Sequence, residues 1–232
     1  MSTFVLVHGA FHGGWCWRAV ADRLRAAGHA VHAPTLTGLG ERSHLLSRSI
    51  DVETHITDVV NVLVFEDLRE VVLVGHSYAG MIVTGVADRI PERLRALVYL
   101  DAVVIDNGET WSSVHPPHVV QARTAEADTH GFFPAPSPEV FGVTEPAGRE
   151  WVARHLTAHP AGTYRQPLSL QHPIGNAIAK TYIDCTSPRY STLNRVKARV
   201  RADPQWRVVE LATAHDAMVT APEELSRILE AL

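Results

Sequence analysis

The ten residues from 71 to 80 decide the fold, and they read Val-Val-Leu-Val-Gly-His-Ser-Tyr-Ala-Gly. The aliphatic run Val71–Val74 predicts a buried strand, and the pattern over Tyr78–Asp88 predicts a helix directly after it. Ser77 therefore stands in a tight turn between a strand and a helix. Such a turn holds a serine in a strained conformation with its hydroxyl clear of the backbone, which indicates a nucleophile. The departure from the usual pattern is Ala79, where a glycine is more common.

Short apolar runs alternate with helical patterns on both sides of this turn, as is typical of a parallel sheet covered by helices. We therefore expect an α/β fold with one six-stranded, mostly parallel, doubly wound sheet. The other expected strands are Phe4–Val7, Ala30–Ala33, Leu94–Leu100, Thr181–Cys185 and Trp206–Leu211. The other expected helices are Trp15–Ala27, one that begins after the N-cap Asp51, Ser191–Ala202 and Pro222–Leu232. Ligands of such sheets bind beyond the carboxyl ends of the strands.

The segment 105–175 differs from the rest, because prolines and aromatic residues crowd there and prolines interrupt regular sheets. We expect this segment to be an inserted cap of short helices and loops. The core then consists of residues 1–104 and 176–232. Phe11 and Trp111 are expected to line the substrate pocket, with the aromatic cap excluding water.

A serine nucleophile needs a base, and in this topology the histidine follows the last strand. His215 stands there and is the expected base. The loop after the strand Thr181–Cys185, where the third member usually lies, contains no carboxylate. Asp101 is the preferred acid, because it ends the strand that follows the nucleophile's helix. Asp184 and Asp216 remain as alternatives.

The negative charge of a tetrahedral intermediate needs two backbone donors. We expect the N–H of Tyr78 and the N–H of Ala10, with Phe11 as the second choice for the latter. His8 and His12 are not expected to bind a metal, because they follow a strand and no acidic partner accompanies them in the sequence. The glycines of this loop lack the spacing of phosphate-binding motifs, and no cofactor is expected.

The composition excludes several classes of protein. With 21 basic and 25 acidic residues the formal net charge is −4, which argues against a nucleic-acid or anionic-membrane partner. The two cysteines form no disulfide framework, and the N-terminus does not resemble a signal peptide, so the expected location is the cytoplasm. The expected partner is a small-molecule ester, and a homodimer is left open as the oligomeric state.

Three stretches resemble the α/β-hydrolase superfamily: residues 4–17, residues 72–81 and Ala-His-Asp-Ala-Met at 214–218. Within it, the chain is similar to the plant methylesterase and hydroxynitrile lyase group and its bacterial esterase relatives. The resemblance implies an ester hydrolase with Ser77, His215 and the Ala10 and Tyr78 donors, and some members take the acid from the position of Asp101. The lyases need a threonine and a lysine where this chain has Gly9 and Asp216, so cyanohydrin cleavage is not expected.

The leading hypothesis is therefore a serine esterase that cleaves a small, largely apolar carboxylic ester through an acyl-enzyme. Two alternatives use the same fold. One is cleavage of an amide or a carbon–carbon bond by the same residues. The other is a small-molecule binder without catalytic activity.

Overall fold

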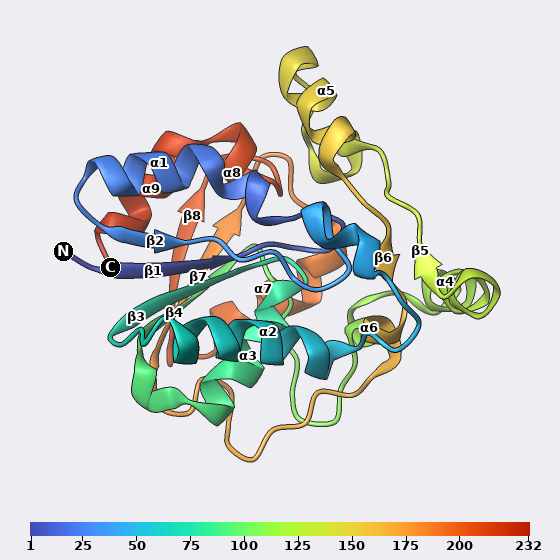
Figure 1. The fold of residues 1–232 in the computed structure, drawn as a ribbon, viewed down its shortest axis with the longest axis horizontal. Coiled ribbons are helices and arrows are strands. Elements are labelled where there is room, and N and C mark those ends of the chain that lie inside the picture. Colours follow the sequence, from blue (N-terminus) through green and yellow to red (C-terminus); the bar gives the residue numbers. More distant parts are fainter.

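The six expected strands form one sheet in the computed structural model, which describes residues 1–232 (Figure 1). All neighbouring strands are parallel, in the order β2-β1-β3-β4-β7-β8. The α/β fold with a doubly wound sheet is thereby confirmed. The strands are β1 (Thr3–Val7), β2 (Ala30–His32), β3 (Val71–His76), β4 (Leu94–Leu100), β7 (Ala179–Cys185) and β8 (Trp206–Leu211).

Helices cover both faces of the sheet, because alternate residues of each strand point to opposite sides. Phe4 and Leu6 belong to the apolar cluster under α1, α8 and α9, whereas Val5 and Val7 belong to the cluster under α2, α3 and α7. Two buried faces explain why β1 and β3 are nearly continuous apolar runs, whereas β7 and β8 also carry charged residues such as Lys180 and Arg207. The helices are α1 (Arg18–Ala26), α2 (Val52–Phe65), α3 (Ala79–Arg89), α7 (Asn194–Ala202), α8 (Ala217–Thr220) and α9 (Pro222–Glu230).

The helix ends differ in detail from the sequence-based expectation. The expected helix Trp15–Ala27 is a 3-10 turn, Gly14–Trp17, followed by α1, and the turn Ser191–Leu193 likewise precedes α7. Apolar spacing does not distinguish a tight turn from the first turn of an α-helix. The expected N-cap of α2 is confirmed, since the Asp51 side chain accepts a hydrogen bond from the Thr54 N–H at 2.9 Å.

Between residues 105 and 175 the chain leaves the large sheet and forms elements beside it (Figure 1). These are α4 (Pro117–His130), α5 (Pro146–His155), α6 (Gly162–Arg165) and the strands β5 (Phe132–Phe133) and β6 (His159–Pro160). Helix α4 has 14 residues and is longer than the expected short helices. The two strands pair antiparallel in a sheet of their own. Strands of two residues leave no periodic pattern, so the sequence does not predict them. Measured against what a bilayer crossing requires, every helix is too short or too polar.

Candidate active site

Ser77 lies in the turn between β3 and α3 in a left-handed backbone conformation, with φ at +52°. Two backbone hydrogen bonds to the neighbouring strand and its following loop hold this conformation: the Ser77 N–H donates to the Leu100 carbonyl at 3.1 Å, and the Ser77 carbonyl accepts from the Val103 N–H at 2.8 Å. Gly80 lets α3 approach closely, because a Cβ there would lie 2.1 Å from the Val103 carbonyl oxygen. The turn therefore presents the Ser77 hydroxyl above the end of β3.

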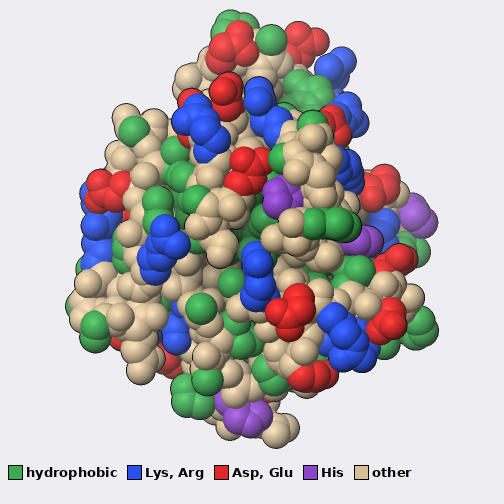
Figure 2. All heavy atoms as spheres, turned by 90° about the vertical axis from the view of Figure 1, so that its left-hand side faces the viewer, with side chains coloured by type: hydrophobic (Ala, Val, Ile, Leu, Met, Phe, Trp, Pro, Cys, Tyr) green, Lys and Arg blue, Asp and Glu red, His purple; other side chains and the backbone are tan.

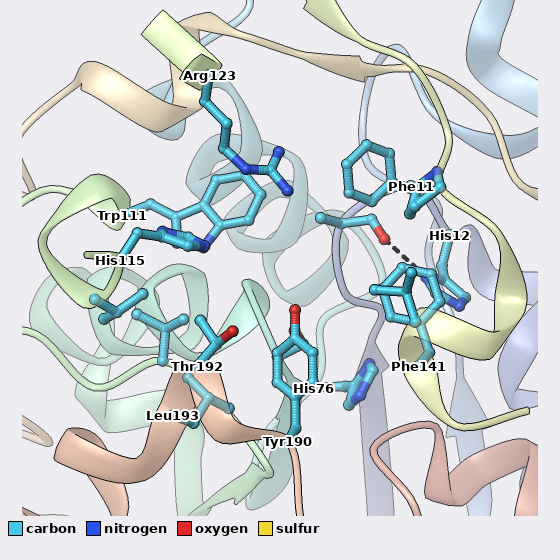
Figure 3. A pocket seen from close by; sticks show the side chains of 16 residues that line it. Phe11, His12, His76, Trp111, His115, Arg123, Phe141, Tyr190, Thr192 and Leu193 are labelled. Carbon is cyan, nitrogen blue, oxygen red and sulfur yellow. Dashed lines mark hydrogen bonds between the residues drawn. The ribbon is translucent and has the colours of Figure 1, made fainter. Parts of the chain in front are cut away.

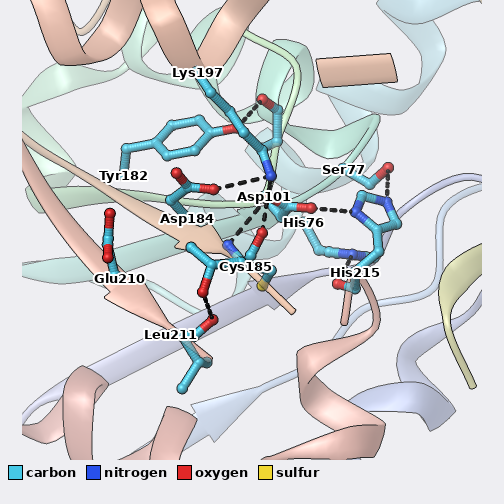
Figure 4. A network of polar contacts seen from close by, with 12 residues as sticks. His76, Ser77, Asp101, Tyr182, Asp184, Cys185, Lys197, Glu210, Leu211 and His215 are labelled. Atoms are coloured by element: carbon cyan, nitrogen blue, oxygen red, sulfur yellow. Dashed lines mark hydrogen bonds and ion pairs between the residues drawn. The ribbon is translucent and has the colours of Figure 1, made fainter. Parts of the chain in front are cut away.

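Ser77, His215 and Asp101 form one chain of hydrogen bonds (Figure 4). The His215 Nε2 lies 2.9 Å from Ser77 Oγ, and the His215 Nδ1 lies 2.6 Å from Asp101 Oδ2. A carboxylate only accepts, so Nδ1 carries the proton and Nε2 accepts from the serine hydroxyl. Asp101 and His215 are both buried. The structure thus brings together the three side chains that the sequence selects, although 138 residues separate His215 from Ser77.

The two alternative acids lie elsewhere. Asp184 points to the helix α7 side, where its Oδ2 accepts from the Arg201 guanidinium at 2.5 Å. Asp216 is turned away from the imidazole of its neighbour, and its Oδ2 lies 2.9 Å from His12 Nε2. Neither carboxylate contacts the His215 ring.

Lys197 is a buried cation beside Asp101, and no motif in the sequence distinguishes it. Its Nζ lies 2.6 Å from Asp101 Oδ1 and 2.9 Å from Asp184 Oδ1, and it donates to the Cys185 carbonyl at 3.0 Å (Figure 4). Its side chain is 3% exposed. Two buried carboxylates without a cation would be costly, so Lys197 balances their charge. The one available signal is its rarity, since Lys180 is the only other lysine.

Replacing Lys197 by methionine is expected to lower the free energy of unfolding by about 3–5 kcal/mol, because it leaves buried carboxylates without their cation. Urea unfolding at neutral pH measures this. The activity of this variant should also fall at the acid end of the pH–rate profile, because protonation of a carboxylate relieves the negative charge that Lys197 no longer balances. The matched control is Lys180→Met, which removes a partly exposed lysine and should change stability by less than about 1 kcal/mol. Equal stabilities for the two variants would contradict the role of Lys197.

The loop after β1 supplies backbone N–H groups near Ser77. The N–H groups of Ala10 and Tyr78 donate no hydrogen bond within the protein, so both are free to bind another acceptor. The Phe11 N–H, the second choice, instead points to His159 Nδ1 at 3.4 Å. Phe11 has φ at +69°, and this conformation turns the loop toward the pocket. The geometry therefore favours Ala10 over Phe11 as the donor that complements Tyr78.

The expectation that no acidic residue accompanies the loop histidines is wrong for His12. Its Nε2 contacts Asp216, which lies 204 residues away and so escapes a local search. Burial lowers the pKa of His12, but the charge and hydrogen bond of Asp216 outweigh it and raise that pKa. His8 lies apart, with Nε2 accepting from the Leu36 N–H at 3.0 Å, and burial lowers its pKa to about 3. The two histidines thus serve separate structural contacts.

His76 anchors the loop that carries the candidate base. Its Nε2 donates to the His215 carbonyl at 3.0 Å. Burial, followed by the nearby His215 and His12, holds the pKa of His76 well below its usual value, so the ring is neutral. Tyr190 stacks on the His215 ring with 4.1 Å between centroids, and Phe141 lies 6.2 Å away by the same measure. The imidazole is therefore held by packing as well as by hydrogen bonds.

A small pocket opens over Ser77, with a cavity volume of about 50 Å³. Ala10, Phe11 and Trp111 line it, as the sequence predicts for the last two (Figure 3). Further lining residues come from the cap and from the turn that leads into α7, and they carry no local motif by which the sequence could predict them. These are His115, Arg123, Phe141, Tyr190, Thr192 and Leu193.

The fold is that of an α/β hydrolase, and the profile of the alpha/beta hydrolase family matches residues 4–228. The chain belongs to that family, which confirms the resemblance seen in the sequence. A carbendazim hydrolyzing esterase from Nocardioides sp. (strain SG-4G) is 41% identical over 242 residues, covering 100% of both chains. Methylesterase 7 from Arabidopsis thaliana is 27% identical and covers 97% of this chain and 94% of its own length.

Solved structures share the fold at lower identity. An extracellular alpha/beta-hydrolase from a Paenibacillus species superimposes with a TM-score of 0.86 at 22% identity, covering 100% of this chain and 98% of that one. At this level of identity the comparison supports the fold alone.

Proposed function

We propose that the protein hydrolyses small, largely apolar carboxylic esters, with Ser77 as the nucleophile and a covalent acyl-enzyme as the intermediate. That the chain is a carboxylic ester hydrolase rests on its family and on its full-length similarity to an esterase. The observation that carries the finer proposal is the hydrogen-bonded chain from Ser77 through His215 to Asp101 beneath a pocket.

In the proposed reaction, Ser77 Oγ attacks the ester carbonyl while His215 Nε2 takes the hydroxyl proton. The N–H groups of Ala10 and Tyr78 bind the oxyanion of the tetrahedral intermediate. His215 then gives its proton to the leaving alkoxide, which departs as the alcohol and leaves an acyl group on Ser77. Water, deprotonated by His215, attacks this acyl group and releases the acid. Asp101 holds the imidazole in the productive tautomer and stabilises its cation throughout.

The pocket supports a small group at the reacting carbon. Its volume of about 50 Å³ lies far below the roughly 300–1,000 Å³ of pockets for drug-sized ligands. Aromatic side chains of Phe11, Trp111 and Phe141 line it and exclude water, which strengthens the electrostatic contacts of the site. A compact acyl or alkoxy group therefore fits best next to Ser77.

The cytoplasm remains the proposed location. The two cysteines, Cys16 and Cys185, are free and buried in the structure, which agrees with a reducing compartment. A homodimer remains a prediction from the sequence.

A panel of 4-nitrophenyl esters tests the proposed function. We expect kcat/KM to be highest for acetate and to fall along propionate, butyrate and octanoate, because the pocket next to Ser77 is small. The matched 4-nitroanilides should react at least about a hundredfold more slowly, since their leaving group is poorer. The measurement is release of nitrophenol or nitroaniline by absorbance. Absence of ester turnover, together with no labelling of Ser77 by a fluorophosphonate, would contradict the proposal.

A further inference from the structure

A second, larger hollow adjoins the pocket over Ser77 and has no part in the proposed bond-making steps. Its volume is about 580 Å³. The hollow and the pocket share the lining residues Val114, His115, Arg123, Tyr190 and Thr192. Because the inner pocket is so small, any part of an ester beyond a compact group next to Ser77 extends into this hollow. The hollow is therefore the place where the remote part of a substrate is recognised.

The charge of this hollow is opposite to that of the whole chain. The protein carries a formal net charge of −4, but the hollow is lined by Arg123 and Arg195 and by no aspartate or glutamate. Three other arginines near the cap, Arg149, Arg165 and Arg199, have acidic partners, as Arg199 has in Asp106 at 2.7 Å. The guanidinium groups of Arg123 in α4 and Arg195 in α7 form no ion pair and no hydrogen bond within the protein. Two cations without a counter-charge thus face one cavity.

Arg123 is held in place by apolar contacts. Its guanidinium lies over the ring of Phe133 at 5.2 Å and over the ring of Tyr164 at 5.9 Å. It is only partly exposed, and it extends from α4 toward the pocket (Figure 3). Stacking fixes the plane of a guanidinium and leaves its N–H groups free for a planar acceptor. The side chain is therefore ready to bind an anion without reorganisation.

The opposite wall of the hollow adds neutral donors. Ser191, Thr192 and Asn194 line it, and they stand at the turn that leads into α7. The N-terminus of a nine-residue helix favours negative charge nearby. This contribution alone would be weak, but it has the same sign as that of the two arginines. The charged groups and the helix N-terminus thus favour an anion, and the hydroxyl and amide groups can donate hydrogen bonds to it.

We propose that Arg123 and Arg195 form a carboxylate-binding subsite, so that the preferred substrates are esters with a carboxylate remote from the scissile bond, such as half-esters of dicarboxylic acids. This inference rests on the proposed function and leaves the chemistry at Ser77 unchanged. A carboxylate matches the fork of an arginine through two parallel hydrogen bonds. A neutral ester of the same length lacks that contact and leaves both guanidinium groups without a counter-charge.

The test compares esters of equal length that differ only in charge. Monomethyl glutarate is paired with methyl pentanoate, and monomethyl adipate with methyl hexanoate, with acid release followed in a pH-stat at low salt. The readout is the ratio of kcat/KM for the anionic ester to that for its neutral partner. We expect the double variant Arg123→Gln, Arg195→Gln to lower this ratio at least about tenfold relative to the wild type. Arg123→Lys should retain part of the wild-type preference for the anionic ester.

The double variant Arg95→Gln, Arg207→Gln is the matched control, because both arginines are exposed on strands, lie outside the hollow, and their removal changes the net charge by the same amount. It should leave the ratio at the wild-type value. Equal ratios in the wild type and in the Arg123→Gln, Arg195→Gln variant would overturn the subsite, while turnover of the neutral esters would leave the proposed function intact.

A binding measurement covers the case in which neither methyl ester is turned over. Monomethyl glutarate is titrated calorimetrically into Ser77→Ala, with and without the two arginine substitutions. If the two arginine substitutions weaken the binding of monomethyl glutarate at least about tenfold, the result supports the subsite even when no ester is turned over. Equal binding overturns it. If neither the methyl esters nor the 4-nitrophenyl esters were hydrolysed, the proposed function would be overturned, whatever the binding measurement showed for the subsite.

Discussion

Ser77→Ala is expected to reduce the turnover of 4-nitrophenyl acetate by at least about 10⁴-fold, because no other hydroxyl contacts His215 Nε2. Water in the pocket could still react slowly with help from His215 and the backbone donors, so a residual rate above the buffer is compatible with the proposal. The wild type should also show a burst of nitrophenol and an acetyl mass on the peptide that contains Ser77. Both signals should be absent from the variant.

The control for this substitution is Ser169→Ala. Ser169 is exposed and makes no side-chain hydrogen bond, so this variant should keep the wild-type rate within a factor of about two. If Ser77→Ala retained the burst and the acetylated peptide, the nucleophile would have to be another residue. If it retained the rate but lost the burst, an acyl-enzyme on Ser77 would be excluded as the route.

Asp101→Asn is expected to reduce kcat by about 10³–10⁴-fold with little change in KM, because Asp101 does not line the pocket over Ser77. Asparagine preserves the shape of the side chain but removes the charge that stabilises the imidazolium. Its amide can also donate to Nδ1 and so favour the unproductive tautomer of His215. Steady-state kinetics on 4-nitrophenyl acetate across pH 6–9 measures both parameters.

Asp184→Asn separates catalysis from stability in the same charge cluster. Asp184 shares Lys197 with Asp101 but does not contact His215, so this variant should lose stability while kcat stays within about tenfold of the wild type. Burial raises the pKa of Asp184, but its bonds to Arg201 and Lys197 outweigh this and lower it. Asp184 therefore stabilises the fold above its unfolded pKa, and this contribution disappears as the pH falls through the folded pKa. If Asp101→Asn kept the wild-type kcat, Asp101 would not be the residue that orients His215, and another carboxylate would have to do so.

The sequence predicts the sheet well, because a strand buried on both faces must be apolar at every position. Val71–Val74 satisfies this completely, and Leu94–Leu100 satisfies it except at the exposed Arg95; the parallel order follows from the helices between the strands. Ser77 is also predictable from the sequence, because the few residues around it are enough to indicate a tight turn between a strand and a helix. The prediction of Asp101 depends on the topology of the sheet, because the carboxyl ends of neighbouring parallel strands lie side by side.

Contacts between distant residues account for most of what the sequence does not predict. Lys197 meets Asp101 across 96 residues, and His12 meets Asp216 across 204. No periodicity or spacing encodes such pairs, because each partner lies in an unremarkable local context. Arg123 is similar, since its place in the pocket depends on how α4 packs against the core. The helix α4 is weakly amphipathic, with Ala127 as its only buried residue, so its pattern gives little information about its orientation.

The two lysines also differ in their chemical accessibility. Lys197 is buried in its ion pairs, whereas Lys180 is partly exposed as the second residue of β7, at the amino end of that strand. Ser77 follows the carboxyl end of β3. Because all strands of the sheet are parallel, Ser77 and Lys180 lie at opposite ends of the strands. A support that carries amine-reactive groups would capture the folded protein through Lys180 or through the exposed amino group of Met1, which precedes β1. Both amines lie at the amino ends of the strands, so the pocket over Ser77 would be directed away from the surface.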